Sequence, residues 1–318
     1  MERKKNIWIL GGTGFIGNAL VRYLSAKPEN RLHLLLNKNT PYRELEGYNT
    51  FSGGLSEIDL QWLEMYPPDI IFHLARPAGK NHITRKIASL TGNQLNRRLI
   101  RIISALSSSP VIVYVSGSLM YGRRQVCDPA SESSKLAPDS FARFYHQTEK
   151  PWIEEQKRGE LDVRFARPGW ILGPGSWFRK FFWEPYLGSG KVPCYGDGNQ
   201  MMSIIHMDDC AVMVDILGSK GVRGQNLNIF SGKPIPQYEF SRLMAEIVGA
   251  EIEFIHINTL RRKFGSTTAD ALCSSSSMTT EYSFIHQKAD IVFKNKESML
   301  TDVIRLLKNK QGILPETP

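Results

Sequence analysis

The sequence predicts an α/β fold built on a doubly wound parallel sheet, with a smaller subdomain toward the C-terminus. Two observations predict it. Through the first half of the chain, apolar runs typical of buried strands alternate with segments of helical apolar periodicity. The first apolar run also leads directly into a glycine-rich turn. A chain of 318 residues suits one such domain with an appended subdomain better than two independent domains.

The glycine-rich turn separates the first predicted strand, residues 7–10, from a helical segment that begins at Phe15. In this setting Gly11 permits a tight turn, Gly14 lets the backbone approach a pyrophosphate, and Gly17 lets the helix pack closely on the sheet. The helix N-terminus offers free N–H groups and a positive dipole end to phosphates. The turn therefore predicts a Rossmann-type fold that binds a dinucleotide. The predicted binding residues of this turn are Gly11, Thr13, Gly14, Phe15, Ile16 and Gly17.

The remaining elements follow from apolar periodicity. Strands are predicted at 31–36, 69–75, 111–115, 162–166 and 226–230, and helices at 60–65, 87–106, 141–157 and 237–249. Their alternation is typical of βαβ units, so the sheet is expected to be parallel. Pro151 predicts a kink or a new first turn within its helical segment. The segment 267–280 is rich in Ser and Thr and is predicted to be a loop near the pocket.

A change of composition at Gly173 marks the predicted domain boundary. The Rossmann domain is expected to comprise residues 1–173 with a return at about 204–232, and the substrate-binding subdomain residues 174–203 and 233–318. Aromatic residues between Trp177 and Trp183, with Met201 and Met202, favour an apolar or aromatic substrate. At least half of these aromatics are expected to form the subdomain's own core.

Composition and charge limit the class of protein. Hydrophobic residues make up 42% and charged residues 22%, as in soluble globular proteins, and no apolar run approaches the length of a membrane span. The polar segment 1–6 is expected to precede the first strand rather than to be a signal peptide. The 4 cysteines have no paired spacing, which favours free thiols in a reducing cytoplasm. The net charge of +9 is dispersed and forms no nucleic-acid module, so a small molecule is the expected partner, not nucleic acid or a membrane.

The end of the second predicted strand bears on which dinucleotide binds. In such folds an acidic residue here binds the ribose 2′-OH of NAD, and a basic residue suits the 2′-phosphate of NADP. This chain has Asn37 and Lys38 at that place, and both are predicted cofactor-binding residues. The sequence therefore favours NADP, with NAD as the alternative.

Several motifs stand in the order found in one family. They are GGTGFIG at 11–17, FHLA at 72–75, VS at 115–116 followed by YG at 121–122, RPGWILGP at 167–174, YGDGNQ at 195–200 and HMDD at 206–209. With them the chain resembles the extended short-chain dehydrogenase/reductase family, in its sugar-epimerase-like branch, from residue 7 to about residue 249. The resemblance implies that Leu74, Ala75, Pro168 and Gly169 also contact the dinucleotide. It further implies a homodimer.

In that family a Ser or Thr, a Tyr and a Lys carry the chemistry, and the Tyr stands four residues before the Lys, so both lie on one face of a helix. The tyrosine exchanges a proton with the substrate oxygen while hydride moves to or from the cofactor. The serine or threonine binds the same oxygen. The lysine lowers the tyrosine pKa and holds the nicotinamide ribose.

This chain departs from that pattern. If Lys150 is the family lysine, His146 stands at the tyrosine position. If Tyr145 is the family tyrosine, Glu149 stands at the lysine position. The serine position, four residues before the Tyr-Gly pair, is Gly117, with a serine on either side.

Three interpretations remain open at this point. In the first, His146 replaces tyrosine as the acid/base, with Lys150 on the cofactor and Ser118 assisting. In the second, Tyr145 and Ser118 act after small local shifts, such as a one-residue π-bulge that brings Tyr145 and Lys150 onto one face. In the third, the fold binds nucleotide but the usual redox catalysis is lost or replaced. The candidate catalytic residues are thus His146, Lys150, Ser118 and Tyr145.

The substrate is expected to differ from a sugar nucleotide. Members of the branch that bind one often carry an arginine shortly after the YGDG turn, and it grips the pyrophosphate. The matching residue here is Met202, whose thioether cannot do so. The expected function is oxidation or reduction of a carbonyl or alcohol on a partly apolar, non-nucleotide small molecule, in a biosynthetic pathway. The alternatives are a redox-neutral epimerase, dehydratase, lyase or cyclase, and a non-catalytic NADP-binding or scaffold protein.

Overall fold

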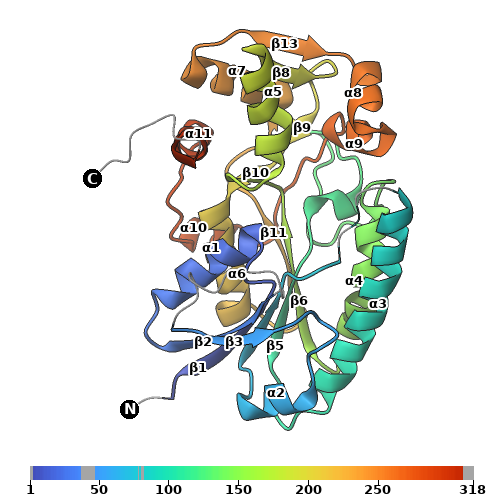
Figure 1. The fold of residues 1–318 in the computed structure, drawn as a ribbon, viewed down its shortest axis with the longest axis vertical. Coiled ribbons are helices and arrows are strands. Elements are labelled where there is room, and N and C mark those ends of the chain that lie inside the picture. The colour runs from blue at the N-terminus through green and yellow to red at the C-terminus, as the bar shows by residue number, and fades with distance from the viewer. Residues whose placement is uncertain (1–2, 37–46, 78, 80–81, 311–318) are drawn as a thin grey trace.

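A computed structural model describes residues 3–36, 47–77, 79 and 82–310 (Figure 1). Its central sheet has seven parallel strands in the order β11-β6-β5-β4-β1-β2-β3. The strands are β1 Lys5–Leu10, β2 Asn30–Leu36, β3 Asn49–Ser52, β4 Ile70–His73, β5 Val111–Val115, β6 Asp162–Pro168 and β11 Asn226–Ile229. The strand order reverses between β1 and β4, which leaves a crevice at their carboxyl ends. The predicted doubly wound parallel sheet is confirmed.

Helices cover both faces of the sheet (Figure 1). They are α1 Phe15–Ser25 and α6 Met207–Lys220 on one face, and α2 Leu60–Met65, α3 His82–Ser104 and α4 Arg143–Arg158 on the other. The side chains of β1 alternate between the two layers: Ile7 and Ile9 pack toward α1 and α6, while Trp8 and Leu10 pack toward α3 and α4. Because both faces are covered, the strands read as continuous apolar runs rather than alternating ones.

Helix α4 continues through Pro151, so no new helix begins there and that part of the prediction is wrong. Proline has no N–H to donate to the carbonyl of Gln147. Asn93 of α3 replaces that donor, since its Nδ2 donates to the Gln147 oxygen at 2.8 Å. Asn96 Nδ2 donates in the same way to the carbonyl of Thr148 at 2.8 Å. These side chains fix α4 against α3 and so position the residues that α4 presents to the crevice.

A smaller lobe with its own apolar core lies beyond the carboxyl ends of the strands, at the top of Figure 1. Its elements include the π-helix η3 Arg179–Trp183, the helices α5 Glu184–Ser189, α7 Gln237–Val248, α8 Ile257–Phe264 and α9 Ser266–Leu272, and the paired strands β8 Val192–Tyr195 and β13 Ile252–Ile255. Of the aromatic cluster, Phe178, Phe182 and Trp183 are buried in this core, whereas Trp177 and Phe181 are only partly buried.

The other short elements are η2 Ser118–Tyr121, β7 Trp170–Leu172, β9 Met201–Met202, β10 Ile204–His206, β12 Ile235–Pro236 and α10 Ser283–Lys288. The 15-residue helix α11 Lys296–Lys310 packs in the core of the smaller lobe. Strand β7 pairs with β10, and β9 pairs with β12.

None of the helices in the described part of the chain has the length and apolar composition needed to cross a bilayer.

The segment 267–280 is not entirely a loop, which corrects the prediction. Its first part belongs to α9, whose Ala269 and Leu272 are buried in the core of the smaller lobe. In the sequence of this segment, Ser and Thr outnumber the apolar residues that pack, so the helical pattern is weak. Beyond the helix the chain is extended, and Ser276 bridges to both Arg124 and Met202.

Candidate active site

The turn after β1 has the geometry that its glycines predict. Gly11 has a φ of +95°, and the N–H of Gly14 donates to the Gly11 carbonyl at 3.0 Å. A Cβ at position 17 would lie only 2.1 Å from the Gly11 oxygen, so Gly17 is required for α1 to stack on the turn. Gly14 caps α1 without a side-chain hydrogen bond. The first N–H groups of α1 therefore remain available to an anion.

A cavity of about 450 Å³ opens at this turn. Its walls include Thr13 and Gly14 of the turn and Leu74 and Ala75 beyond β4, all of them predicted cofactor residues. The loop 53–56 completes the wall, and the sequence did not reveal it because strand β3 before it is short. The predicted cofactor residues Asn37 and Lys38 lie outside the described residues.

A second cavity, of about 470 Å³, adjoins the first at Arg76, which lines both. On the sheet side its walls are formed by Phe15, Ile16, Pro168 and Gly169, again predicted cofactor residues. Both cavities have residues beyond the carboxyl ends of strands in their walls and share Arg76, and together they are called the groove below. A dinucleotide bound at the glycine turn would extend along this groove.

Tyr145 lines the second cavity together with Ser116, Gly117 and Ser118. The structure therefore brings Tyr145 and Ser118 to one space. The guanidinium carbon of Arg76 lies 4.3 Å from the centre of the Tyr145 ring. Such a cation is attracted by the ring face.

His146 and Lys150 line neither cavity. The His146 Nδ1 atom lies 3.8 Å from Glu149 Oε1. The side chain of Lys150 is 53% exposed, with its Nζ 4.0 Å from Glu154 Oε1. Helix α4 is a regular α-helix throughout, without the π-bulge that would bring Tyr145 and Lys150 onto one face. The structure thus does not bring Lys150 to the groove, either as a catalytic residue or as a cofactor ligand.

Glu149, one helical turn after Tyr145, belongs to a buried polar cluster with Arg167 and Ser116. The Arg167 Nη1 donates to Glu149 Oε1 at 3.3 Å and to the Ser116 hydroxyl at 3.0 Å, and that hydroxyl donates to Glu149. Burial by itself raises the pKa of the Glu149 carboxyl, but the charge of Arg167, the nearby imidazole of His146 and the hydrogen bond from Ser116 outweigh burial and leave that pKa lowered. Glu149 is therefore an ionised partner of Arg167.

The smaller lobe supplies the opposite wall of the second cavity. Trp177, Lys180 and Phe181 contribute to it, as does α9 through Thr268 and Leu272. The sequence did not single out Arg76 or Lys180. The position of Arg76 directly beyond a strand end is the kind of signal that marks a crevice residue, whereas Lys180 has no such signal.

The chain also matches a known protein family. The model of the NAD dependent epimerase/dehydratase family matches residues 7–230. The chain belongs to this family. The likeness to extended short-chain dehydrogenases/reductases that the motifs predict is thereby confirmed.

Individual relatives of the family are distant in sequence. The chain is 25% identical over 273 residues to a dTDP-glucose 4,6-dehydratase of Streptomyces antibioticus, covering 77% of each chain. Among solved structures, UDP-glucuronic acid 4-epimerase from Bacillus cereus in complex with NAD has a TM-score of 0.78 at 15% identity, covering 98% of this chain and 99% of that one. A human epimerase family protein with NADPH has a TM-score of 0.75 at 18% identity, covering 94% and 99%. At these identities the solved structures support the fold.

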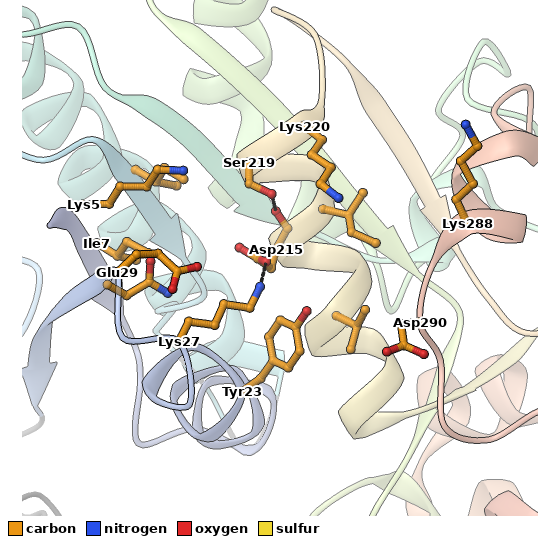
Figure 2. A pocket seen from close by; sticks show the side chains of 14 residues that line it. Lys5, Ile7, Tyr23, Lys27, Glu29, Asp215, Ser219, Lys220, Lys288 and Asp290 are labelled. Carbon is orange, nitrogen blue, oxygen red and sulfur yellow. Dashed lines mark hydrogen bonds and ion pairs between the residues drawn. The ribbon is translucent and has the colours of Figure 1, made fainter. Parts of the chain in front are cut away.

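A third cavity, of about 360 Å³, lies at the amino ends of the strands (Figure 2). Lys5 and Asn30, where β1 and β2 begin, contribute to its wall. Within it Lys27 Nζ lies 2.6 Å from the buried carboxylate of Asp215. Because ligands of such sheets bind at the carboxyl ends, we assign this cavity to the packing of α1 against α6.

In the described part of the chain no group of three or more His, Cys, Asp or Glu side chains is placed to hold a metal ion.

Proposed function

We propose that this protein is an NAD(P)-dependent enzyme in which Tyr145 is the acid/base for a hydroxyl or carbonyl group of a small-molecule substrate. The observation that carries the proposal is that Tyr145 shares the second cavity with Ser118 and with the residues beside the glycine turn. The alternative acid/base, His146, lines neither cavity of the groove. This is the second interpretation of the sequence, with Tyr145 and Ser118 as the acting residues but without the π-bulge on α4.

The groove fits a dinucleotide on two observations: α1 has no side-chain cap, and Gly17 leaves no room for a Cβ between the turn and the helix. When bound, the dinucleotide accepts or supplies a hydride. The chain's own part is to move the proton. Tyr145 takes it from or gives it to the substrate oxygen, and the Ser118 hydroxyl binds that oxygen.

A cation beside the tyrosine is still needed, because Glu149 stands where the family has lysine. Arg76 supplies it, with its guanidinium over the Tyr145 ring at 4.3 Å from the ring centre. The negative charge of Glu149 does not oppose this role, since Arg167 pairs with that carboxylate within the buried cluster. The positive charge beside Tyr145 thus comes from Arg76, beyond the end of β4, rather than from a lysine on α4.

The family favours redox-neutral chemistry, in which the substrate is oxidised, altered and reduced again within one turnover. Relatives of this chain are named dehydratases and epimerases. Their named substrates are nucleotide sugars, but in this chain the residue that the YGDG motif matches to the pyrophosphate-binding arginine is Met202, an apolar side chain in the core of the smaller lobe. We therefore propose a redox-neutral reaction on a partly apolar, non-nucleotide substrate. NADP is the proposed cofactor because of Lys38, with NAD as the alternative.

The test is a substrate screen with the purified protein. It is incubated with NAD or NADP and with panels of small alcohols, ketones and nucleotide sugars, while nicotinamide absorbance and product mass are followed. A product formed without net change in absorbance supports the proposal. Stoichiometric cofactor reduction or oxidation supports the simple oxidoreductase. Tight dinucleotide binding with no product from any panel supports the non-catalytic alternative, to which the replacement of the family lysine by Glu149 also points.

A further inference from the structure

The charged side chains around the second cavity, called the substrate cavity from here on because Tyr145 and Ser118 line it, differ from those around the third cavity. Arg76, Arg85 and Lys180 line the substrate cavity, and none of the described residues in its wall is acidic. In the third cavity, by contrast, lysines lie beside carboxylates, as the pairing of Lys27 with Asp215 shows (Figure 2). A cleft lined by one sign of charge concentrates ligands of the opposite sign. The substrate cavity is therefore electrostatically suited to an anion.

Arg85 of α3 is held by neutral groups. Its Nε donates to the carbonyl of Gly79 at 3.3 Å, its Nη1 lies 3.5 Å from the Thr267 hydroxyl, and its guanidinium lies over the Phe141 ring at 5.4 Å. Among the described residues no carboxylate pairs with it. Arg85 is thus oriented without being neutralised, and its charge is left for a ligand.

Lys180 and its neighbour Arg179 on η3 differ in whether a carboxylate pairs with them. Arg179 pairs with Glu184 at 3.1 Å and lines no part of the cavity. Lys180 lines the cavity, and its Nζ lies 5.4 Å from the centre of the Phe181 ring. Of the three cations in the cavity wall, Arg76 lies over the Tyr145 ring, which leaves Arg85 and Lys180. Arg85 comes from α3 of the sheet domain and Lys180 from η3 of the smaller lobe, so both lobes contribute positive charge to one cavity.

The apolar part of the same wall completes the site. Trp177 and Phe181 are the partly buried members of an aromatic cluster whose other members are in the core, and both line the cavity. We infer that the substrate is an aromatic or apolar small molecule that carries one carboxylate or phosphate group, bound by Arg85 and Lys180, with its body against Trp177 and Phe181. This inference rests on the proposed function, since it describes the substrate on which Tyr145 acts.

The inference is tested by calorimetric titration of the protein saturated with NADP, so that the cofactor's own phosphates do not compete. The probes are 2-naphthoate and 2-naphthyl phosphate, with neutral 2-naphthamide as their control. We expect both anions, or one of them, to bind, and naphthamide to bind at least about 10-fold more weakly. The ratio between the two anions identifies the group that the site prefers. Equal binding of naphthamide and both anions would overturn the inference.

Variants assign the binding to the two cations. In the double variant Arg85→Gln, Lys180→Gln, anion affinity is expected to fall about 10-fold or more. In Lys180→Gln alone, anion affinity is expected to fall by a smaller factor. Arg179→Gln is the matched control and is expected to keep it. Unchanged anion affinity in a double variant with normal thermal unfolding would overturn the inference. Tyr145→Phe separates the two proposals: it is expected to keep probe affinity, and only its turnover bears on the proposed function.

Discussion

The glycine turn and the facing stretch of α4 line one groove, but they are built differently. The turn makes its site from backbone, so the spacing of its glycines determines its geometry, and Gly17 tolerates no Cβ. The stretch of α4 makes its site from side chains, and the direction of each depends on how the helix packs. Tyr145 faces the groove while Lys150, five residues on, is exposed to solvent. A backbone site is therefore readable from spacing, whereas a side-chain site needs the tertiary structure.

The largest expected effect concerns the buried pair of Glu149 and Arg167. Glu149→Ala leaves the Arg167 guanidinium buried without its carboxylate, so the free energy of unfolding is expected to fall by about 3–5 kcal/mol. Lys150→Ala, one residue away and exposed, is expected to change it by less than about 0.5 kcal/mol. Urea denaturation measures both. Equal losses for the two variants would show that Glu149 has no special structural role on α4.

The pH dependence of stability tests the environment of His73, which lies at the end of β4 next to the groove. Burial lowers the pKa of His73, at the end of β4, to about 4, although its hydrogen bond to Asn96 acts against this. The unfolded histidine titrates near 6.5, so between these values the unfolded chain binds more protons and stability falls as the pH falls. The expected slope from His73 is about 1.4 kcal/mol per pH unit. Because the pKa of His33 is also lowered, to about 4, the slope of the whole protein contains more than the contribution of His73. Denaturation is therefore measured between pH 6 and pH 4.5 for the unmodified protein and for His73→Asn, and the slope of the variant is expected to be smaller by about 1.4 kcal/mol per pH unit. A slope that the substitution leaves unaltered would argue against a neutral buried His73.

A substitution in the glycine turn tests the backbone site itself. In Gly17→Ala the new Cβ meets the Gly11 carbonyl, so the turn must shift, with an expected loss of about 1–3 kcal/mol in stability and weaker dinucleotide binding. Gly188→Ala is the control, because no atom lies within 4 Å of the added Cβ. Thermal unfolding and dinucleotide titration provide the readouts. If Gly17→Ala binds dinucleotide as well as Gly188→Ala does, the turn is not the phosphate site.

The smallest expected effect concerns cofactor choice. Lys38→Glu replaces a cation suited to a 2′-phosphate by an anion suited to a ribose hydroxyl. The affinity for NADP is expected to fall about 10-fold relative to that for NAD. Competitive titration of the two dinucleotides measures the ratio. A ratio that is unchanged by the substitution would remove the reason for proposing NADP.

Much of the fold could be predicted because it rests on local patterns. The strand 111–115 and the helix 60–65 are observed at the predicted bounds. Helix α9 was not predicted, because its Ser and Thr residues conceal the two or three apolar positions that pack. The direction of Tyr145 and His146 could not be derived either, since they are neighbours on one helix and the sequence offers two registers, with either Lys150 or Glu149 at the lysine position. The pairing of Glu149 with Arg167 joins α4 to β6, and no local pattern signals it.

The acid/base is tested most directly by turnover of the variants Tyr145→Phe and His146→Ala with a substrate from the screen. Tyr145→Phe is expected to lower kcat by about 100-fold or more while dinucleotide affinity changes less than about 2-fold. His146→Ala is expected to keep kcat within about 3-fold of the unmodified protein, since His146 does not reach the groove. The opposite result, a large loss in His146→Ala and near-normal kcat in Tyr145→Phe, would contradict the assignment of Tyr145.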